Sequence, residues 1–377
     1  MILDACTPRQ DLLSGHFNPE LFTANLSTVL GKYRGTTTIE NIYTNPVAFF
    51  EEATYPTAGL KFTLSEVFGR LQGDNSLPAI HRLENAFGGG KTHTLIACTH
   101  LAFRGNEIAD SVQDLMNPTM LPNPGEVSVV GVAGDRIPVH SQQGDTLVPH
   151  TLWGEMARQI GGDELYRSVA TEAGSRAAPG YPFFEKVLGG RKVLIMLDEL
   201  AQYAVRLDAA ESEGAAQLAA FLMALHGWAR DHSGISVLLT LASASDAFAK
   251  QTARLAELVK EVRGGQAVSE DEALQLGERA VRDLKSVVSR DASMVTPVQP
   301  AEISSVLAKR LFTRIDREIA AEIAKEYDEV YQMNRGMLPD EATRPDFFDR
   351  MVALYPFHPT FIDFLNRKLS TVENFQG

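Results

Sequence analysis

The sequence predicts an α/β fold in which helices cover both faces of a central parallel sheet. Predominantly apolar segments occur at residues 127–132, 193–197 and 235–242, and segments with helical periodicity separate them. Strands that are buried on both faces have such continuous apolar sequences, and their alternation with helices is typical of parallel sheets. A weaker apolar segment at residues 79–84 is expected to add a further strand.

We expect three structural units along the chain. Residues 1–75 are predicted to form an N-terminal helical extension, in which Thr63 and Glu66 have the spacing of a capping box at a helix start. Residues 76–299 contain the alternating strands and helices and are predicted to form the core. Residues 300–377 are helical in pattern, and we expect them to form a helical lid that is incomplete.

Charge and composition argue against several classes of protein. The formal net charge is −13 and no long basic run occurs, so direct DNA binding by this chain is expected to be weak. No apolar run approaches the roughly 18 residues of a membrane span, and the N-terminus does not resemble a signal peptide. The two cysteines, Cys6 and Cys98, are far apart, which argues against a disulfide framework or a zinc site. We expect a cytoplasmic protein. The densest basic cluster is interpreted as a solvated helix face and consists of Lys309, Arg310, Arg314 and Arg317.

Residues 84–94 have the composition of a phosphate-binding loop. They read Glu-Asn-Ala-Phe-Gly-Gly-Gly-Lys-Thr-His-Thr and lie between an expected strand and an expected helix. Glycines allow backbone N–H groups to approach a phosphate, Lys91 would reach the β- and γ-phosphates of a nucleotide, and the Thr92 hydroxyl would bind Mg²⁺. Asn85 stands where the usual pattern has its first glycine, and the alternative interpretation is an ordinary glycine-rich turn. The predicted nucleotide-binding residues are Phe87, Gly88, Gly89, Gly90, Lys91, Thr92 and His93.

Two adjacent carboxylates follow the apolar strand at residues 193–197. Parallel sheets bind their ligands at the carboxyl ends of the strands, so Asp198 and Glu199 are expected at the ligand-binding edge. Asp198 is predicted to hold Mg²⁺ through water, and Glu199 is predicted to act as the general base that activates water. The alternative is a strand that ends in a polar turn. A pair of acids favours hydrolysis over simple storage of a nucleotide.

Two further positions are candidates for contacts with the γ-phosphate. The strand at 235–242 is expected to lie between the strand of the phosphate loop and the strand of the acid pair, so a polar residue at its tip could reach the reacting groups. Ser243 is the first choice there, followed by Thr240 and Ser245. Arg290 precedes a short extended segment and could reach the nucleotide of a neighbouring subunit. The alternative for Arg290 is a surface arginine at a helix end.

The order of these segments resembles the AAA+ division of P-loop ATPases. In this chain the phosphate loop is followed by a second strand, the acid-tipped strand, the polar-tipped strand, a long helical region, an arginine and a helical lid. Residues 296–312 resemble the passage from the last core strand of that division into its lid.

Five segments carry a narrower resemblance. They read Arg9-Gln-Asp-Leu-Leu-Ser-Gly, Phe87-Gly-Gly-Gly-Lys-Thr-His-Thr-Leu, Thr151-Leu-Trp-Gly-Glu, Leu197-Asp-Glu-Leu-Ala-Gln-Tyr-Ala and Tyr355-Pro-Phe-His-Pro. Together they are similar to a prokaryotic ATPase family of phage-defence islands, the family of the domain of unknown function 499, which includes the PglY-like ATPases of BREX-type systems. The resemblance extends from about Arg9 to Gln376, and family members are usually longer than this chain.

This resemblance implies a function and assigns roles to particular residues. Lys91 and Thr92 would contact phosphate and Mg²⁺, Asp198 and Glu199 would be the acid pair, and Arg290 corresponds by position only. The expected activity is Mg²⁺-dependent ATP hydrolysis that drives a conformational change in an anti-phage complex. The expected partners are further copies of the chain and other defence proteins, such as a DNA methyltransferase. A nucleotide-dependent assembly module with little or no hydrolysis is the alternative, and a phosphotransferase is disfavoured by Glu199.

Overall fold

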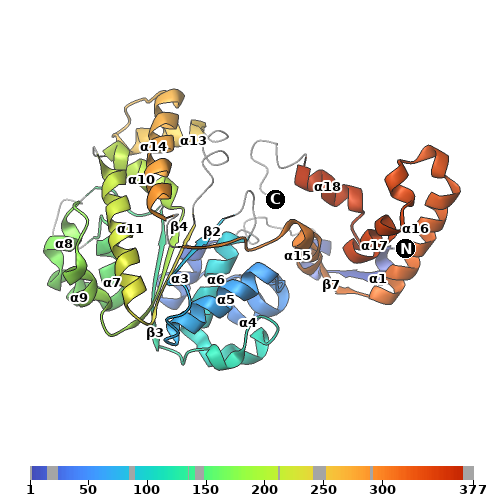
Figure 1. Cartoon of the computed structure of the whole chain (residues 1–377), viewed down its shortest axis with the longest axis horizontal. Coiled ribbons are helices and arrows are strands. Elements are labelled where there is room, and N and C mark those ends of the chain that lie inside the picture. Colours follow the sequence, from blue (N-terminus) through green and yellow to red (C-terminus); the bar gives the residue numbers. More distant parts are fainter. Residues whose placement is uncertain are drawn as a thin grey trace. The chain divides into compact units, whose positions relative to one another are not determined.

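The central sheet has the strand order β3–β4–β5–β2–β6, and all of its neighbouring strands are parallel (Figure 1). It consists of five strands in the part of the chain that the structure describes. The α/β class and the parallel sheet expected from the apolar segments are confirmed. The strands are β2 (Ile80–Leu83), β3 (Val127–Ala133), β4 (Lys192–Asp198), β5 (Ile235–Thr240) and β6 (Ser293–Val295).

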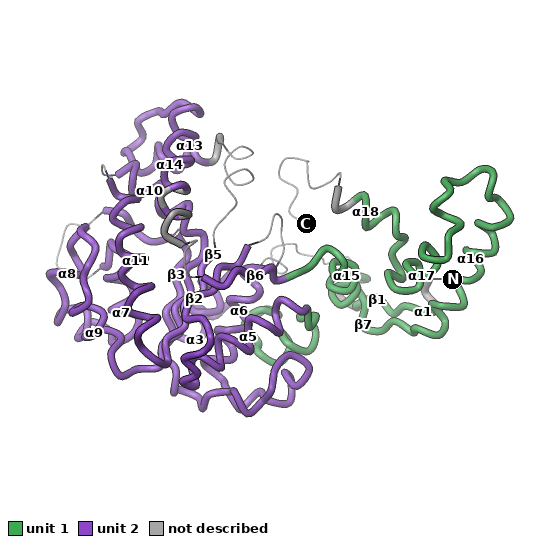
Figure 2. Tube along the Cα trace, viewed as in Figure 1, with its two compact units in different colours: residues 1–23, 40–57, 298–377 green, residues 24–39, 58–297 purple. Residues whose placement is uncertain are grey.

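The structure is a computed structural model. It describes residues 2–14, 24–84, 90–134, 136–140, 148–210, 213–240, 252–288 and 292–367. Contacts divide this part of the chain into two units (Figure 2). Unit 1 comprises Met1–Thr23, Glu40–Thr57 and Val298–Gly377, and unit 2 comprises Ala24–Ile39 and Ala58–Pro297. Both units therefore include segments from the first 75 residues.

Helices cover both faces of the sheet in unit 2 (Figure 1). On β4, Val193, Ile195 and Leu197 point to one face, whereas Met196 lies on the other face within 3.6 Å of the Thr99 hydroxyl. This alternation places apolar side chains on both sides, as a doubly covered strand requires. One face is covered by α3 (Leu26–Tyr33), α5 (Ala58–Leu71) and α6 (Lys91–Arg104), and the other by α7 (Leu152–Ser168), α9 (Tyr181–Leu188), α10 (Leu200–Ala210) and α11 (Gly214–Asp231).

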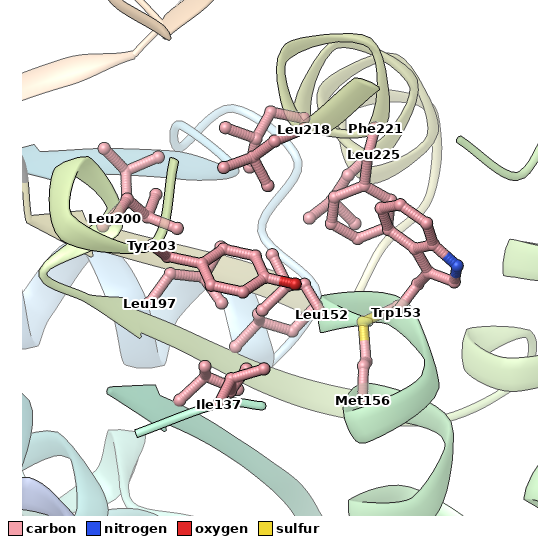
Figure 3. Close-up of a cluster of buried hydrophobic side chains, with 14 of the residues drawn as sticks. Ile137, Leu152, Trp153, Met156, Leu197, Leu200, Tyr203, Leu218, Phe221 and Leu225 are labelled. Atoms are coloured by element: carbon pink, nitrogen blue, oxygen red, sulfur yellow. The ribbon is translucent and has the colours of Figure 1, made fainter. Parts of the chain in front are cut away.

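One hydrophobic core cluster lies between the sheet and the second of these helix layers. Figure 3 shows Leu197 of β4 among side chains from α7, α10 and α11. Trp153 packs against Phe221 with ring centroids 5.2 Å apart, and its indole N–H donates to the backbone oxygen of Glu172 at 2.9 Å. Ile137, which follows β3, is buried in the same cluster. These apolar contacts therefore pack α10 and the segment after β3 against the sheet.

The helix predicted to start at Thr63 in fact starts earlier. Helix α5 begins at Ala58, and the Thr63 hydroxyl donates to the backbone oxygen of Gly59 at 2.8 Å inside the helix. Glu66 does not cap a helix start, because its Oε2 lies 2.9 Å from Nε2 of the buried His81 on β2. A threonine hydroxyl can bond to the preceding turn as well as to a helix end, so the spacing alone was ambiguous.

The helical region after β5 forms a pair of helices. Helix α13 (Thr252–Val262) and helix α14 (Glu270–Val288) are separated by Gly264 and Gly265, which both have positive φ angles. Left-handed backbone of this kind ends a helix and favours glycine. Both helices pack against α10.

Unit 1 combines a two-stranded antiparallel sheet with helices from the end of the chain. Strand β1 (Cys6–Pro8) pairs with β7 (Phe312–Ile315). In the described residues of the chain, no helix is both long enough and apolar enough to cross a membrane. The helices that follow the sheet in unit 1 are α15 (Ile303–Leu311), α16 (Arg317–Met333), α17 (Pro345–Leu354) and α18 (Pro359–Arg367).

The basic cluster of unit 1 is not the face of a single helix. Lys309 and Arg310 lie on α15, Arg314 lies on β7 and Arg317 begins α16. Arg310 donates to the Tyr43 hydroxyl at 2.5 Å, and Arg314 pairs with Asp316 at 2.7 Å. The expectation of one solvated helix face was wrong, because a short strand interrupts the helical pattern between these residues.

Candidate functional site

The loop that precedes α6 ends in a left-handed glycine. Gly90 has φ 80° and ψ 10°, and the first helical N–H bond of α6 runs from Thr94 to the Gly90 oxygen at 2.8 Å. A residue with a side chain rarely adopts this backbone conformation, which explains a glycine immediately before Lys91. Helix α6 thus begins at Lys91, which lies at the positive end of the helix dipole. Thr92 and His93 occupy its first turn, whereas Phe87, Gly88 and Gly89 lie outside the described residues.

Asp198 forms the centre of a polar network at the carboxyl edge of the sheet. Its side chain is buried, with the whole residue 7% exposed. The Thr92 hydroxyl donates to Oδ2 at 3.2 Å, and the Thr240 hydroxyl donates to Oδ1 at 2.6 Å. These contacts join the start of α6 and the ends of β4 and β5 at one point. The network is the strongest concentration of oxygen ligands among the predicted site residues that the structure describes.

Burial raises the pKa of the Asp198 carboxyl above its usual value. Desolvation disfavours the charged form, and this effect outweighs the hydroxyl donors, the Glu199 N–H and the positive charge of Lys91, which all favour that form. A cation beside the carboxylate would act in the same direction as these donors. The Asp198 carboxyl is therefore harder to ionise than that of an aspartate in solvent.

Glu199 occupies a strained turn directly after β4. Its φ of 52° lies in the left-handed region, which costs a non-glycine residue on the order of 1–3 kcal/mol. The Glu199 N–H donates to the Thr240 hydroxyl at 2.9 Å and to Asp198 Oδ1 at 3.1 Å. Its carboxylate is exposed and accepts a hydrogen bond from the Gln202 amide. The turn thus holds one acid inward and presents the adjacent acid outward.

The segment after β3 is connected to this turn. The Gly134 N–H donates to the Asp198 backbone oxygen at 2.9 Å, and a Cβ at Gly134 would lie only 2.4 Å from the Glu199 carbonyl oxygen. Arg206 of α10 donates to the backbone oxygens of Gly134 at 3.0 Å and Ile137 at 2.8 Å. Glycine at 134 is therefore required by the close approach of the two backbones.

The structure brings together some of the predicted residues and leaves others undescribed. Thr92, Asp198 and Glu199 meet at one edge, and Thr240, the second choice for the polar tip of β5, joins them. Ser243, Ser245 and Arg290 lie outside the described residues. Thr240 is paired with Leu83, the last residue of β2, and the apolar pattern of the sequence does not show this register.

Gln202 and Arg206 were not singled out from the sequence. Both lie on α10: Gln202 contacts Glu199 three residues before it, whereas Arg206 contacts the distant Gly134. Their spacing of four residues is typical of one helix face, but it does not show what that face covers.

The oxygen donors at this edge fit a magnesium ion bound together with a phosphate ligand. In the described part of the chain, no group of three or more His, Cys, Asp or Glu side chains could hold a metal ion alone. Mg²⁺ is commonly bound by one or two protein oxygens, with waters and substrate phosphates as further ligands. The Thr92 hydroxyl and the Asp198 carboxylate supply such a pair.

Comparison with protein-family models assigns the chain to a family. A model described as the DUF499 N-terminal domain matches residues 8–264. The chain belongs to the DUF499 family. A second model of this family, the DUF499 second domain, matches residues 299–376. Searches of curated proteins and of solved structures found no match.

The two matched regions of this DUF499 chain contain different helices and strands. The N-terminal domain contains β2 to β5 and the network around Asp198, whereas the second domain contains α15 to α18. Strand β6 lies between the two matches. All described residues of the candidate site therefore belong to the DUF499 N-terminal domain.

Proposed function

We propose that this DUF499 chain binds Mg²⁺-ATP at the carboxyl edge of the sheet and hydrolyses it. The observation that carries the proposal is the network in which Thr92 and Thr240 donate to the two oxygens of Asp198. It joins the residue after a Gly-Gly-Gly-Lys sequence to the acid that ends a central strand, although the two are 106 positions apart. A P-loop nucleotide site requires the hydroxyl residue after the loop lysine to lie close to the acid at the end of a central strand.

The strand order supports a P-loop enzyme of the AAA+ type. Strand β5 pairs with both β2 and β4, so it separates the strand of the phosphate loop from the strand of the acid pair. This is the relation expected from the resemblance to the AAA+ division. It allows the tip of β5 to supply a polar group, here Thr240, between the phosphate loop and Asp198.

Each side chain then has a role that its position allows. Lys91, at the first position of α6, contacts the β- and γ-phosphates together with the backbone N–H groups at the helix start. Thr92 and Asp198 hold Mg²⁺, directly or through water. The ion, when bound, neutralises negative charge on the phosphates.

Glu199 is the general base in this proposal. Its carboxylate is exposed next to the Asp198 network, and in this proposal it contacts a water molecule at the γ-phosphate. The water loses a proton to Glu199 as its oxygen attacks phosphorus, and the bond between phosphorus and the β–γ bridging oxygen breaks to release ADP and phosphate. Gln202 donates to the same carboxylate and orients it.

The wider role follows the family resemblance. We propose that hydrolysis drives a conformational change in an anti-phage complex of the BREX type. The proposed partners are further copies of this chain, one of which would supply Arg290, and other defence proteins such as a DNA methyltransferase. The competing proposal is an assembly module in which bound ATP orders an oligomer without turnover. The exposed Glu199 favours hydrolysis.

Two measurements on the full chain test this function. Calorimetry with ATP is expected to give saturable binding at one site per chain, and omission of Mg²⁺ should weaken it. Release of phosphate measured in the same sample should then exceed that of a Glu199→Gln chain. Binding without release would favour the assembly module, and absence of binding would refute both.

A further inference from the structure

A pocket of about 580 Å³ lies beside β3, the outer strand of the sheet in unit 2. Among described residues its lining contains three arginines and one glutamate, Glu155. The arginines come from separate segments, because Arg34 follows α3, Arg136 follows β3 and Arg158 lies on α7. Its volume falls within the range of small-molecule sites. Convergence of three cations from distant parts of the sequence calls for a functional explanation in a chain with a net charge of −13.

One wall of the pocket is held by side chains that pair with the edge strand. The Gly131 N–H donates to Gln159 Oε1 at 2.9 Å, and Gln159 Nε2 donates to the Gly131 oxygen at 3.1 Å. Arg34 donates to the Val129 oxygen at 3.1 Å and to Gln159 Oε1 at 2.7 Å. These bonds occupy the outward oxygen of Val129 and both outward backbone groups of Gly131, with which an added strand would pair. The pocket is therefore not suited to strand addition, and Arg34 is kept in place as a cation at its wall.

The end of β3 directs a backbone donor toward the same pocket. The Gly134 N–H points inward to β4, where it meets the Asp198 oxygen, whereas the Gly131 N–H points outward to Gln159. Alternate residues of a strand point their N–H groups to the same side. The Ala133 N–H therefore points outward like that of Gly131, and Ala133 lines the pocket. Backbone N–H groups are common ligands of phosphate oxygens.

The charges of the pocket favour an anion with several oxygens. Guanidinium groups match phosphate oxygens with two parallel hydrogen bonds. Glu155 offsets part of this charge, but its Oε1 already accepts from Gln159 Nε2 at 2.6 Å. Arg158 pairs with Asp163 at 3.3 Å, and both side chains are about half exposed, so this ion pair contributes little and can exchange. The remaining lining is mainly apolar or uncharged, as a bound organic group would require.

The pocket is also connected to the turn that carries Glu199. Ile137 lines the pocket, and its carbonyl oxygen accepts a hydrogen bond from Arg206 at 2.8 Å. Arg206 also bonds to Gly134, which contacts the turn after β4. Helix α10, which carries Arg206, begins one residue after Glu199. A ligand that holds the segment after β3 would thus restrict the motion of this turn.

We propose that this pocket binds a small phosphorylated molecule and that the bound ligand stabilises the segment from Glu199 to Arg206. Arg34, Arg136, Arg158 and the Ala133 N–H would contact the phosphate. The binding step is independent of the proposed ATPase activity, whereas any effect on hydrolysis rests on it. Binding of this second ligand in the pocket would then affect the site at Asp198.

The test uses the full chain with Lys91→Ala, so that the proposed ATP site does not compete. Inorganic phosphate and AMP are titrated by calorimetry, with adenosine as the uncharged control. We expect one saturable site for phosphate and for AMP and none for adenosine. Adding Arg158→Gln should weaken binding about tenfold, which is the effect of losing one charged hydrogen bond. Adding Arg167→Gln, on the same helix but outside the pocket lining, should leave affinity unchanged.

Hydrogen exchange provides the second measurement. Saturation with phosphate should slow exchange of the backbone amides of Arg136 and Ile137 and of those at 199–206. Binding that is equal in the Arg158→Gln and Arg167→Gln chains, or no saturable binding at all, would overturn the proposed site. Binding without slower exchange at 199–206 would overturn the connection to Glu199. Both measurements use the Lys91→Ala chain and do not depend on ATP binding. Failure of the ATPase proposal can therefore be distinguished from failure of the pocket proposal.

Discussion

The Thr240 hydroxyl lies 2.6 Å from Asp198 Oδ1 and 2.9 Å from the backbone nitrogen of Glu199. It donates to the carboxylate and accepts from the N–H, so both of its hydrogen-bonding functions are used within one buried contact. Thr240 is 2% exposed and ends β5, whereas Asp198 ends β4. This single side chain therefore sets the position of both acids relative to the neighbouring strand.

Replacing Thr240 by valine removes the hydroxyl group and keeps a side chain of nearly the same shape. Thr240→Val leaves the partly buried Glu199 N–H without one acceptor and removes a donor to Asp198, so we expect the free energy of unfolding to fall by about 1–3 kcal/mol. Mg²⁺-dependent ATP turnover should fall as well. Urea unfolding and a phosphate-release assay measure the two effects.

Two variants serve as controls for this prediction. Thr240→Ser keeps the hydroxyl and should retain most of the turnover. Thr99→Val removes a buried hydroxyl that donates to Leu95 inside α6, and it should affect stability without changing Mg²⁺ dependence. Equal turnover in the Thr240→Val and Thr99→Val chains would show that Thr240 does not support the site.

Lys91→Ala should weaken ATP binding. Lys91 starts α6 after the left-handed Gly90, where its ammonium group can reach the phosphates. Removal of one partner from a charge pair in a binding site costs about 2–5 kcal/mol, so affinity should fall at least about thirtyfold. Calorimetry with Mg²⁺-ATP measures it. Lys61→Ala, at an exposed position on α5, is the matched control. Equal affinities in the two variants would refute the proposed role of Lys91.

Glu199→Gln should leave ATP bound and slow its hydrolysis. The amide cannot accept a proton from water, and loss of a general base reduces rates by about 10²–10⁴-fold. Affinity should change little, because Glu199 is exposed and Asp198 retains the cation. Single-turnover phosphate release measures the chemical step, and Glu164→Gln at an exposed position on α7 is the control. Turnover at the rate of the unmodified chain would identify another base.

Asp198→Asn should stabilise the chain without ligand at neutral pH, although it should weaken Mg²⁺-dependent ATP binding. Burial raises the pKa of Asp198 in the folded state, so the folded chain binds more protons than the unfolded chain between the two pKa values. The stability that comes from this carboxyl is fully present below the unfolded pKa of about 4 and is lost as the pH rises through the folded pKa.

The pH dependence of unfolding tests this account. The free-energy difference between the Asn variant and the unmodified chain should be largest at neutral pH and should decrease as the pH falls toward 4. The asparagine can still accept from Thr240 and can donate to Thr92, so the hydrogen bonds of the network need not be lost. A difference that is constant from pH 4 to pH 7 would contradict a raised pKa at Asp198.

Several expectations depended only on neighbouring residues, and these agree with the structure. Val193 to Leu197 is apolar throughout and forms the buried part of β4, because a strand covered on both faces has no solvent side. Asp198, the acid expected directly after this run, does end β4. In each case the physical cause is local.

Other expectations needed distant contacts, and local patterns were ambiguous for them. Thr63 and Glu66 have capping-box spacing, but α5 begins at Ala58 and Glu66 instead contacts His81 on β2. Ser243 was preferred to Thr240 because it follows the apolar run, whereas the described strand ends at Thr240. Neither the end of a strand nor the partner of a buried acid can be obtained from periodicity alone.

The sequence by itself determined the α/β class, the position of the phosphate-loop pattern before α6 and the acid pair at the end of β4. Apolar runs, the glycines before Lys91 and the order of residues along the chain are local properties of the sequence. Only the tertiary structure decided that Thr92 and Thr240 both reach Asp198 and that Arg34, Arg136 and Arg158 converge beside β3. These contacts join residues that are far apart in the chain, and they depend on strand order and register, which arise when the sheet packs against its helices.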